Sequence, residues 1–147
     1  MKSKKIRRAV FIVTYAIVDG KSHYLILKRH KHWTGWEFPK GGIERWEARR
    51  LTIKRELREE TGLPPMKIRS FPVKGQYQYK KGCEDRPGIA GQTYKLYAVE
   101  VKKDRVKIDK REHSDYKWVS FQEALKKLTW PNQKKCLGIV ELWLKRN

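Results

Sequence analysis

The sequence predicts an α/β (α+β) fold in which a mixed central sheet lies between helices. Three observations support this fold class. Apolar runs of strand length occur early and late in the chain, two segments have the apolar spacing of helices, and strands and helices alternate. That order is typical of layered α/β proteins. With 147 residues the chain is long enough to bury one core, so we expect a single domain, residues 1–147.

The N-terminal part is expected to form a β-hairpin. Residues 10–18 have strand composition, Asp19-Gly20 is a typical turn pair, and residues 24–27 supply the returning strand. A further short strand is predicted at residues 36–38, before a loop rich in Pro and Gly.

A helix is predicted from about Glu47 to Thr61. Its apolar residues are spaced so that one side can face the sheet: Leu51, Ile53 and Leu57. Gly62 follows the helix and suits the left-handed conformation that commonly ends one.

The next segments predict the second half of the sheet. Residues 66–79 read as extended and residues 80–91 as a loop with several Gly and Pro. Residues 93–101 are nearly continuously apolar, so we expect a central strand there. After a polar stretch, residues 116–119 form the last predicted strand.

Two helices are expected at the C-terminal end. Ser120 and Glu123 form a capping box that opens a helix ending at Leu128. Trp130-Pro131 should break it, and Asn132 can cap a final helix. The final helix has an apolar face made of Leu137, Ile139, Val140, Trp143 and Leu144.

The first predicted helix carries three closely spaced carboxylates. Glu56 and Glu60 lie one turn apart with Glu59 between them, so all three crowd one face and repel one another. One interpretation is a solvated face balanced by neighbouring Lys and Arg. The other is a site for a divalent cation with hard oxygen ligands, Mg²⁺ or its possible substitute Mn²⁺. The preceding loop can bring Lys40 and backbone groups close to an anion such as a substrate phosphate. A phosphate would also bind a cation held by the carboxylates, so this context favours the cation site.

Residues 41–63, GGIERWEARRLTIKRELREETGL, contain a longer pattern. They match Gly, five residues, Glu, seven residues, Arg-Glu-apolar-x-Glu-Glu-x-Gly-apolar at all nine specified positions. In this the chain resembles the Nudix hydrolases. The resemblance implies the α/β/α sandwich of that fold and a pyrophosphohydrolase, in which water attacks a phosphorus of a nucleoside diphosphate linked to another group. One position departs from the common pattern, since Trp46 stands where Nudix boxes often have Gly.

The resemblance also implies roles for individual residues. Glu59 and Glu60 would be the principal metal ligands, and Glu56 a further ligand or the general base. The catalytic set would then be Glu56, Arg55 and Glu59, with Arg55 orienting the carboxylates.

Other metal ligands are expected around this set. Glu47 completes the box, and Gly41 would offer its backbone carbonyl. Many members add a carboxylate from outside the box, for which Glu112 is our candidate, followed by Asp115 and Glu84. A solvated loop glutamate is the alternative for Glu112.

The substrate must be inferred from the segments outside the box. YLILKRHKHWTGWEFPKGGIE and REHSDYKWVSFQEALKKL look most like the diadenosine polyphosphate hydrolases of the superfamily, which implies cleavage of a substrate such as diadenosine tetraphosphate to ATP and AMP. Adenine could stack on aromatic side chains, although core packing explains some of them equally well. These are Trp33, Trp36, Tyr77, Tyr79 and Tyr94. The phosphate chain could meet Lys40, Lys80 and Lys81.

Two further functions stay open. The first is an RNA 5′-end pyrophosphohydrolase, a decapping-type enzyme or another nucleotide pyrophosphatase acting on ADP-ribose or deoxynucleoside triphosphates. The second, more distant, is a non-catalytic nucleotide- or RNA-binding module, against which the complete set of carboxylates argues.

The charge of the chain bears on its partners. It has 36 Lys and Arg against 16 Asp and Glu, a formal net charge of +20. This excess favours a polyphosphate or nucleic acid partner, RNA included, but a Lys-rich composition would also produce it. No protein partner is evident. No apolar run is long enough to cross a bilayer, and Cys83 and Cys136 lack a ligand pattern, so we expect a cytoplasmic protein without a membrane partner.

Overall fold

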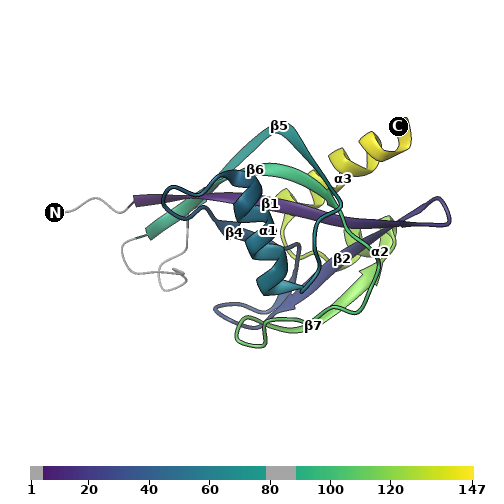
Figure 1. Ribbon diagram of the computed structural model, residues 1–147. Coiled ribbons are helices and arrows are strands. Elements are labelled where there is room, and N and C mark those ends of the chain that lie inside the picture. The colour runs from purple at the N-terminus through teal and green to yellow at the C-terminus, as the bar shows by residue number, and fades with distance from the viewer. Residues whose placement is uncertain (1–4, 79–88) are drawn as a thin grey trace.

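The computed structural model describes residues 5–78 and 89–147, in which one mixed sheet is flanked by helices (Figure 1). Seven strands of this part of the chain form the sheet. They are β1 Lys5–Val18, β2 Lys21–Arg29, β3 Gly35–Glu37, β4 Lys40–Gly42, β5 Lys67–Gln78, β6 Ile89–Glu100 and β7 His113–Val119.

The strand order confirms a mixed sheet. Its main path is β3-β2-β1-β6-β5, with β4 paired to β1 and β7 paired to β2. The β1–β6 pair is parallel, and the other pairs are antiparallel. β1 and β2 form the predicted hairpin, in which Asp19 and Gly20 have φ angles of 51° and 75°. Two consecutive residues with positive φ fit the right-handed twist of the flanking strands.

The helices form one layer on each face of the sheet. They are α1 Arg49–Glu60, α2 Phe121–Lys127 and α3 Pro131–Arg146. One buried cluster joins Ile53 and Leu57 of α1 to Val10 and Ile12 of β1. A second cluster, on the opposite face, joins α2 and α3 to the alternate residues of β1, which are Phe11, Val13 and Tyr15. The α/β/α arrangement is therefore confirmed. Alternate side chains of β1 point to opposite faces of the sheet, so they belong to two different hydrophobic clusters.

Several element boundaries differ from the sequence-based prediction. β1 begins at Lys5 rather than at residue 10, β6 begins at Ile89 within the predicted loop of residues 80–91, and β7 begins at His113 rather than at residue 116, because pairing with neighbouring strands extends all three. α1 begins at Arg49 rather than Glu47, because Trp46 has a φ of 68° and Ala48 is extended. α3 begins at Pro131, so this proline opens the helix instead of Asn132 capping it. β4 was not predicted, since its Gly-rich sequence has no strand composition; it pairs with β1 through Gly41 and Gly42.

The capping box at α2 is confirmed. Ser120 Oγ accepts a hydrogen bond of 3.2 Å from the Glu123 backbone N–H. Across the described residues, none of the helices is long and apolar enough to span a membrane.

Candidate active site

A polar cavity of about 330 Å³ lies beside α1 and β4. Carboxylates from α1 and from the loop before β7 line one part of it, and basic residues from β1, β2 and the adjoining loops line another. The lining residues are Arg7, Arg29, Lys31, His32, Lys40, Gly41, Glu44, Arg55, Glu56, Glu59, Glu60, Gln92, Asp109, Arg111 and Glu112. We refer to this cavity as the catalytic pocket.

The position of α1 brings its three carboxylates to the pocket. Ile53 and Leu57 are fully buried against the sheet and fix the rotation of the helix. Glu56 and Glu60, one turn apart, are then drawn into the protein, with 8% and 4% of their surface exposed. Glu59 lies nearer the solvent. The predicted set of three is therefore together at one site, with two of its members buried.

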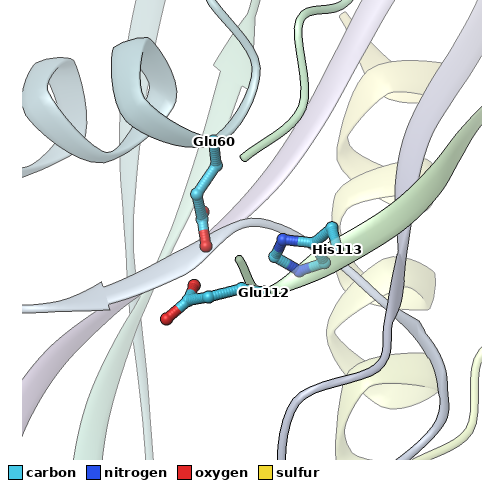
Figure 2. Close-up of side chains that lie close together, drawn as sticks. All are labelled: Glu60, Glu112 and His113. Carbon is cyan, nitrogen blue, oxygen red and sulfur yellow. The ribbon is translucent and has the colours of Figure 1, made fainter. Parts of the chain in front are cut away.

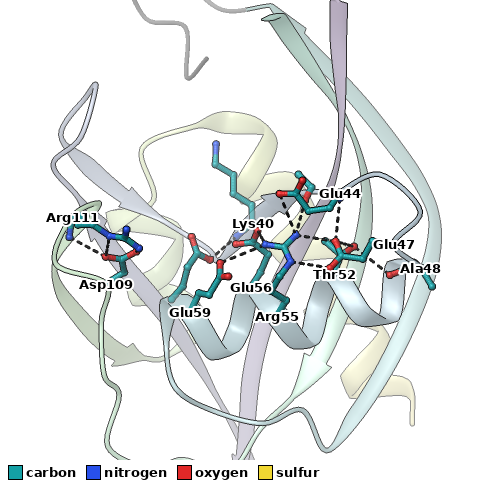
Figure 3. A network of polar contacts seen from close by, with 12 residues as sticks. Lys40, Glu44, Glu47, Ala48, Thr52, Arg55, Glu56, Glu59, Asp109 and Arg111 are labelled. Atoms are coloured by element: carbon teal, nitrogen blue, oxygen red, sulfur yellow. Dashed lines mark hydrogen bonds and ion pairs between the residues drawn. The ribbon is translucent and has the colours of Figure 1, made fainter. Parts of the chain in front are cut away.

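Arg55 links these carboxylates to the start of the box (Figure 3). Its Nε and Nη2 donate to the two oxygens of Glu47 at 2.8 and 2.9 Å. Nη1 donates to Glu56 Oε1 at 2.8 Å and lies 3.5 Å from Glu59 Oε2. Nη2 also donates to the carbonyl of Gly42 at 3.0 Å. A planar guanidinium is suited to these divergent contacts, which an ammonium could not all make.

The ion pair with Arg55 sets the charge of Glu47. Hydrogen bonds from Arg55, together with one from Thr52, outweigh the effect of partial desolvation and lower the pKa of Glu47 to about 2. The same hydrogen bonds to Glu47 raise the pKa of Arg55. Glu47 is thus a fixed anion whose role in the structure is to hold Arg55 against the other carboxylates.

In contrast to Glu47, the pKa values of Glu56 and Glu60 are raised. Burial raises the pKa of Glu56 to about 7, with Arg55 opposing the rise and the charge of Glu59 adding to it. Burial, together with the charges of Glu56, Glu37 and Glu112, raises the pKa of Glu60 well above its ordinary value. A second positive charge between these side chains would relieve both effects.

The glycine of β4 allows a close approach to this cluster. A Cβ atom added at Gly41 would lie 2.0 Å from the carboxyl carbon of Glu56, so any other residue would displace that side chain. Next to it, the Lys40 backbone N–H donates to Glu60 Oε2 at 3.2 Å. The carboxyl end of Glu56 can therefore lie against β4 because residue 41 has no side chain.

Glu112 reaches the pocket from the loop before β7 and joins a further group (Figure 2). Ligand atoms of Glu60, Glu112 and His113 all lie within 4.8 Å of one another. His113 Nε2 is 2.8 Å from Glu37 Oε2, whereas His113 Nδ1 is buried without a hydrogen-bond partner among the described residues. Because the Glu37 carboxylate is an acceptor, a neutral His113 would carry its proton on Nε2 and leave Nδ1 as a free electron pair.

Glu37 anchors this side of the site. Its carboxylate is fully buried between Arg29, Lys40 and His113, with Nη1 of Arg29 at 3.2 Å and Nζ of Lys40 at 3.7 Å. Desolvation alone would raise its pKa, but the positive charge of Lys40 and the hydrogen bond from His113 outweigh it and lower the pKa to about 2. Glu37 and His113 were missed in the sequence. Their positions in the sequence could have indicated them: Glu37 lies within WEFPKGG, directly before the box, and His113 directly follows the candidate ligand Glu112.

The residues present fit a divalent cation. The carboxylates of Glu56, Glu59, Glu60 and Glu112 offer hard oxygen ligands. His113 Nδ1 offers a lone pair that has no hydrogen-bond partner among the described residues, while His113 Nε2 contacts the Glu37 carboxylate. An imidazole held in this way by a carboxylate is a common feature of metal sites. The carboxylate oxygens suit octahedral Mg²⁺ or Mn²⁺, whereas an imidazole ligand is more usual for Zn²⁺ or Fe²⁺.

The predicted substrate-binding residues are only partly brought together. Lys40 lines the pocket. Trp33 and Trp36 do not line it: Trp33 packs edge-on against Trp130 at 5.2 Å, and Trp36 lies beneath Lys117 and Lys127.

The remaining candidates lie elsewhere. Tyr77 is in β5, but its side chain is outside the described residues, as are Tyr79, Lys80, Lys81 and Glu84 altogether. Asp115 is exposed on β7 and does not line the pocket. Besides Lys40 and Arg55, which were predicted, four further basic residues line the pocket and were not predicted, since nothing in a sequence with scattered basic residues distinguishes them: Arg7, Arg29, Lys31 and Arg111.

A family model for the NUDIX domain matches residues 5–137. Among curated proteins, an RNA pyrophosphohydrolase of a Nitratiruptor species is 31% identical over 88% of this chain and 88% of its own. An RNA pyrophosphohydrolase of a Sulfurovum species is 26% identical over 99% of this chain and 98% of its own.

Solved structures show the same fold. A C. elegans Ap4A hydrolase superposes with a TM-score of 0.76 at 19% identity, covering 97% of this chain and all of its own (100%). The NUDIX domain of Shewanella oneidensis NrtR, complexed with ADP ribose, superposes with a TM-score of 0.75 at 19% identity, covering 96% of this chain and 90% of its own. At this identity the likeness concerns the fold.

Proposed function

Because the chain belongs to the NUDIX domain family and is a pyrophosphohydrolase, we propose that it acts on the 5′-triphosphate end of RNA. The observation that carries the proposal is the composition of the catalytic pocket. Carboxylates that suit a cation stand beside basic residues that suit a phosphate chain, and no Phe, Tyr or Trp is among its described lining. The curated relatives that span most of the chain are named for this activity.

The basic residues have a distinct task in this proposal. Arg7, Lys31 and Arg111 line the pocket together with Lys40, so a triphosphate placed there would meet positive charge along its length. Arg111 is itself held by Asp109, whose oxygens lie 3.1 Å from its Nε and Nη2. This surface ion pair keeps the guanidinium near the edge of the pocket only weakly, because the Arg111 side chain is 87% exposed.

The carboxylates would hold Mg²⁺, with Mn²⁺ as a possible substitute. When bound, the cation would neutralise phosphate charge and acidify a water molecule. Glu59, Glu60, Glu112 and the carbonyl of Gly41 are the proposed ligands. Glu56, kept in place by Arg55, is a further ligand or accepts the proton of the attacking water. The anhydride bond between the α- and β-phosphates breaks, which leaves an RNA 5′-monophosphate and pyrophosphate.

A dinucleoside polyphosphate such as diadenosine tetraphosphate is the second candidate. It is favoured by the same row of basic residues, and by Trp33, over which the pocket residue Arg29 lies at 5.9 Å. It ranks second because the two predicted tryptophans pack against other side chains outside the pocket lining. This reverses the order that the sequence favoured.

A side-by-side assay tests the proposal. RNA with a 5′-triphosphate, diadenosine tetraphosphate, ADP-ribose and deoxynucleoside triphosphates are compared at equal concentration with Mg²⁺, and the products are separated by chromatography. We expect the highest specificity constant for RNA, with pyrophosphate as a product. ATP and AMP from a faster reaction of diadenosine tetraphosphate would favour the second candidate, and no reaction with any compound would refute both.

A further inference from the structure

A second cavity of about 490 Å³ lies between the start of α1 and strands β1, β5 and β6. Four basic residues line it, and no carboxylate is among its described lining residues. The lining is Arg8, Ala9, Ile43, Arg49, Lys74, Gly75, Gln76, Thr93, Tyr94 and Lys95. We call the part formed by Arg8, Arg49, Lys74 and Lys95 the basic groove.

The sheet register places like charges opposite one another in this groove. Lys74 of β5 is the direct partner of Lys95 of β6 in the antiparallel ladder. Side chains of such a pair leave the same face with Cβ atoms roughly 5 Å apart, and like charges there are destabilising. In the neighbouring row, Arg8 of β1 is the partner of Thr93. An anion above these rows would remove the repulsion.

Two features, one at the first residue of α1 and one in the loop before it, point to the same kind of ligand. The Nε atom of Arg49 is buried and has no hydrogen-bond partner among the described residues. Trp46, in the loop between Ile43 and Arg49, is 91% exposed and has a φ of 68°. Its side chain contributes nothing to the core, and the guanidinium of Arg45 lies over its ring, 5.6 Å from the ring centroid. It does offer a flat surface on which a base can stack.

The groove adjoins the catalytic pocket. Arg7 lines the pocket and Arg8 the groove, because successive side chains of β1 point to opposite faces. Gly41 lines the pocket and Ile43 the groove, and the Ile43 backbone N–H donates to the Arg8 carbonyl at 2.9 Å. Neighbouring residues of the same two chain segments therefore line both cavities.

We propose that the basic groove and Trp46 bind the single-stranded RNA that follows the 5′ end held in the catalytic pocket. The inference rests on the proposed function, since it names where the body of that substrate lies. A positively charged groove combined with aromatic side chains is the arrangement with which proteins bind single-stranded nucleic acid. Here Tyr94 is in the lining, and Trp46 lies in the chain segment between the lining residues Ile43 and Arg49. Arg8, Lys74 and Trp46 are exposed, so an anionic membrane is the alternative partner, and the vesicle measurement below distinguishes it from RNA.

The test removes two charges from the groove and compares a matched control. Lys74→Gln with Lys95→Gln is the groove variant, and Lys102→Gln with Lys103→Gln, exposed beyond the other end of β6, is the control of equal charge. Binding of a fluorescent single-stranded RNA with a 5′-hydroxyl is measured by anisotropy over a range of salt concentrations. This RNA has no triphosphate, so its binding does not depend on catalysis.

We expect the groove variant to bind RNA about tenfold more weakly at low salt and to have a salt slope smaller by about 1.4, as for two lost phosphate contacts on a single strand. The control should change little. Trp46→Gly, which relieves the strained φ, should also weaken binding several-fold. Without RNA, the groove variant should be at least as stable as the natural protein, because a like-charge pair is gone.

The outcomes separate the two proposals. If 5′-triphosphorylated RNA is hydrolysed but the groove variant and the control bind RNA equally, the groove assignment is wrong while the proposed function stands. If RNA is bound through the groove but not hydrolysed, the proposed function fails and the groove remains. Loss of binding to vesicles of anionic phospholipid, with RNA binding intact, would show a membrane surface instead and overturn the inference.

Discussion

Replacing Arg55 by Lys should damage both the stability and the chemistry of the protein. The guanidinium donates to Glu47, to Glu56 and to the Gly42 carbonyl, at distances from 2.8 to 3.0 Å. One ammonium group can keep the positive charge but cannot reach all three partners. At least two hydrogen bonds to charged groups should be lost, and such bonds contribute about 1.5–3 kcal/mol each. Because the side chain of Arg55 is 20% exposed, water replaces part of this loss.

We therefore expect Arg55→Lys to lower the free energy of unfolding by roughly 2–4 kcal/mol. Glu56 would lose the contact that holds its position, so kcat/KM should fall by about a hundredfold, and more Mg²⁺ should be needed for half-maximal activity. The matched control is Arg58→Lys, which is exposed on the same helix.

The assay combines urea unfolding with initial rates over a range of Mg²⁺ concentrations. If Arg55→Lys behaves like Arg58→Lys in stability, rate and Mg²⁺ requirement, then the contacts of Arg55 do not organise the site and the reasoning is refuted.

Three other predictions concern backbone strain, pH and the residue outside the box. Trp46→Gly should raise the free energy of unfolding by roughly 0.5 kcal/mol, since relief of the positive φ exceeds the added chain entropy of glycine; a lower urea midpoint would contradict this. In a chelator, stability should fall by up to about 3 kcal/mol as pH rises from 4.5 to about 7. Over that window native Glu56 keeps a proton that the unfolded chain has released, so a flat urea-unfolding profile would contradict the raised pKa. Glu112→Gln should lower kcat/KM by about tenfold or more and weaken Mn²⁺ binding, measured by electron paramagnetic resonance, whereas exposed Asp115→Asn should change neither.

The sequence predicted those parts of the structure that follow from local pattern. The hairpin at Asp19-Gly20, the helix of the box and the capping box at Ser120 all depend on neighbouring residues, and all three are present. β4 could not be predicted, because it exists through pairing with β1 and through the close contact between Gly41 and Glu56.

The site was predictable on α1 and much less so elsewhere. Glu56 and Glu60 are fixed by helical spacing, which is a local property. His113 and Glu37 meet across 76 positions of the chain, so only the fold reveals that they are partners. The basic lining of the pocket was hidden for a different reason, since a chain with 36 Lys and Arg offers no signal that separates functional from solvated cations.

The most direct test of the proposed activity is the release of pyrophosphate from 5′-triphosphorylated RNA by the natural protein and by Glu60→Gln, assayed in parallel with Mg²⁺. Glu60 is buried and its pKa is raised, so the neutral amide should be tolerated by the fold, which circular dichroism can verify. We predict that the natural protein releases pyrophosphate and leaves a 5′-monophosphate, and that the variant is slower by about a hundredfold or more. A folded variant with a near-normal rate would contradict the role of the α1 carboxylates, and a natural protein that releases no pyrophosphate would contradict the proposed substrate.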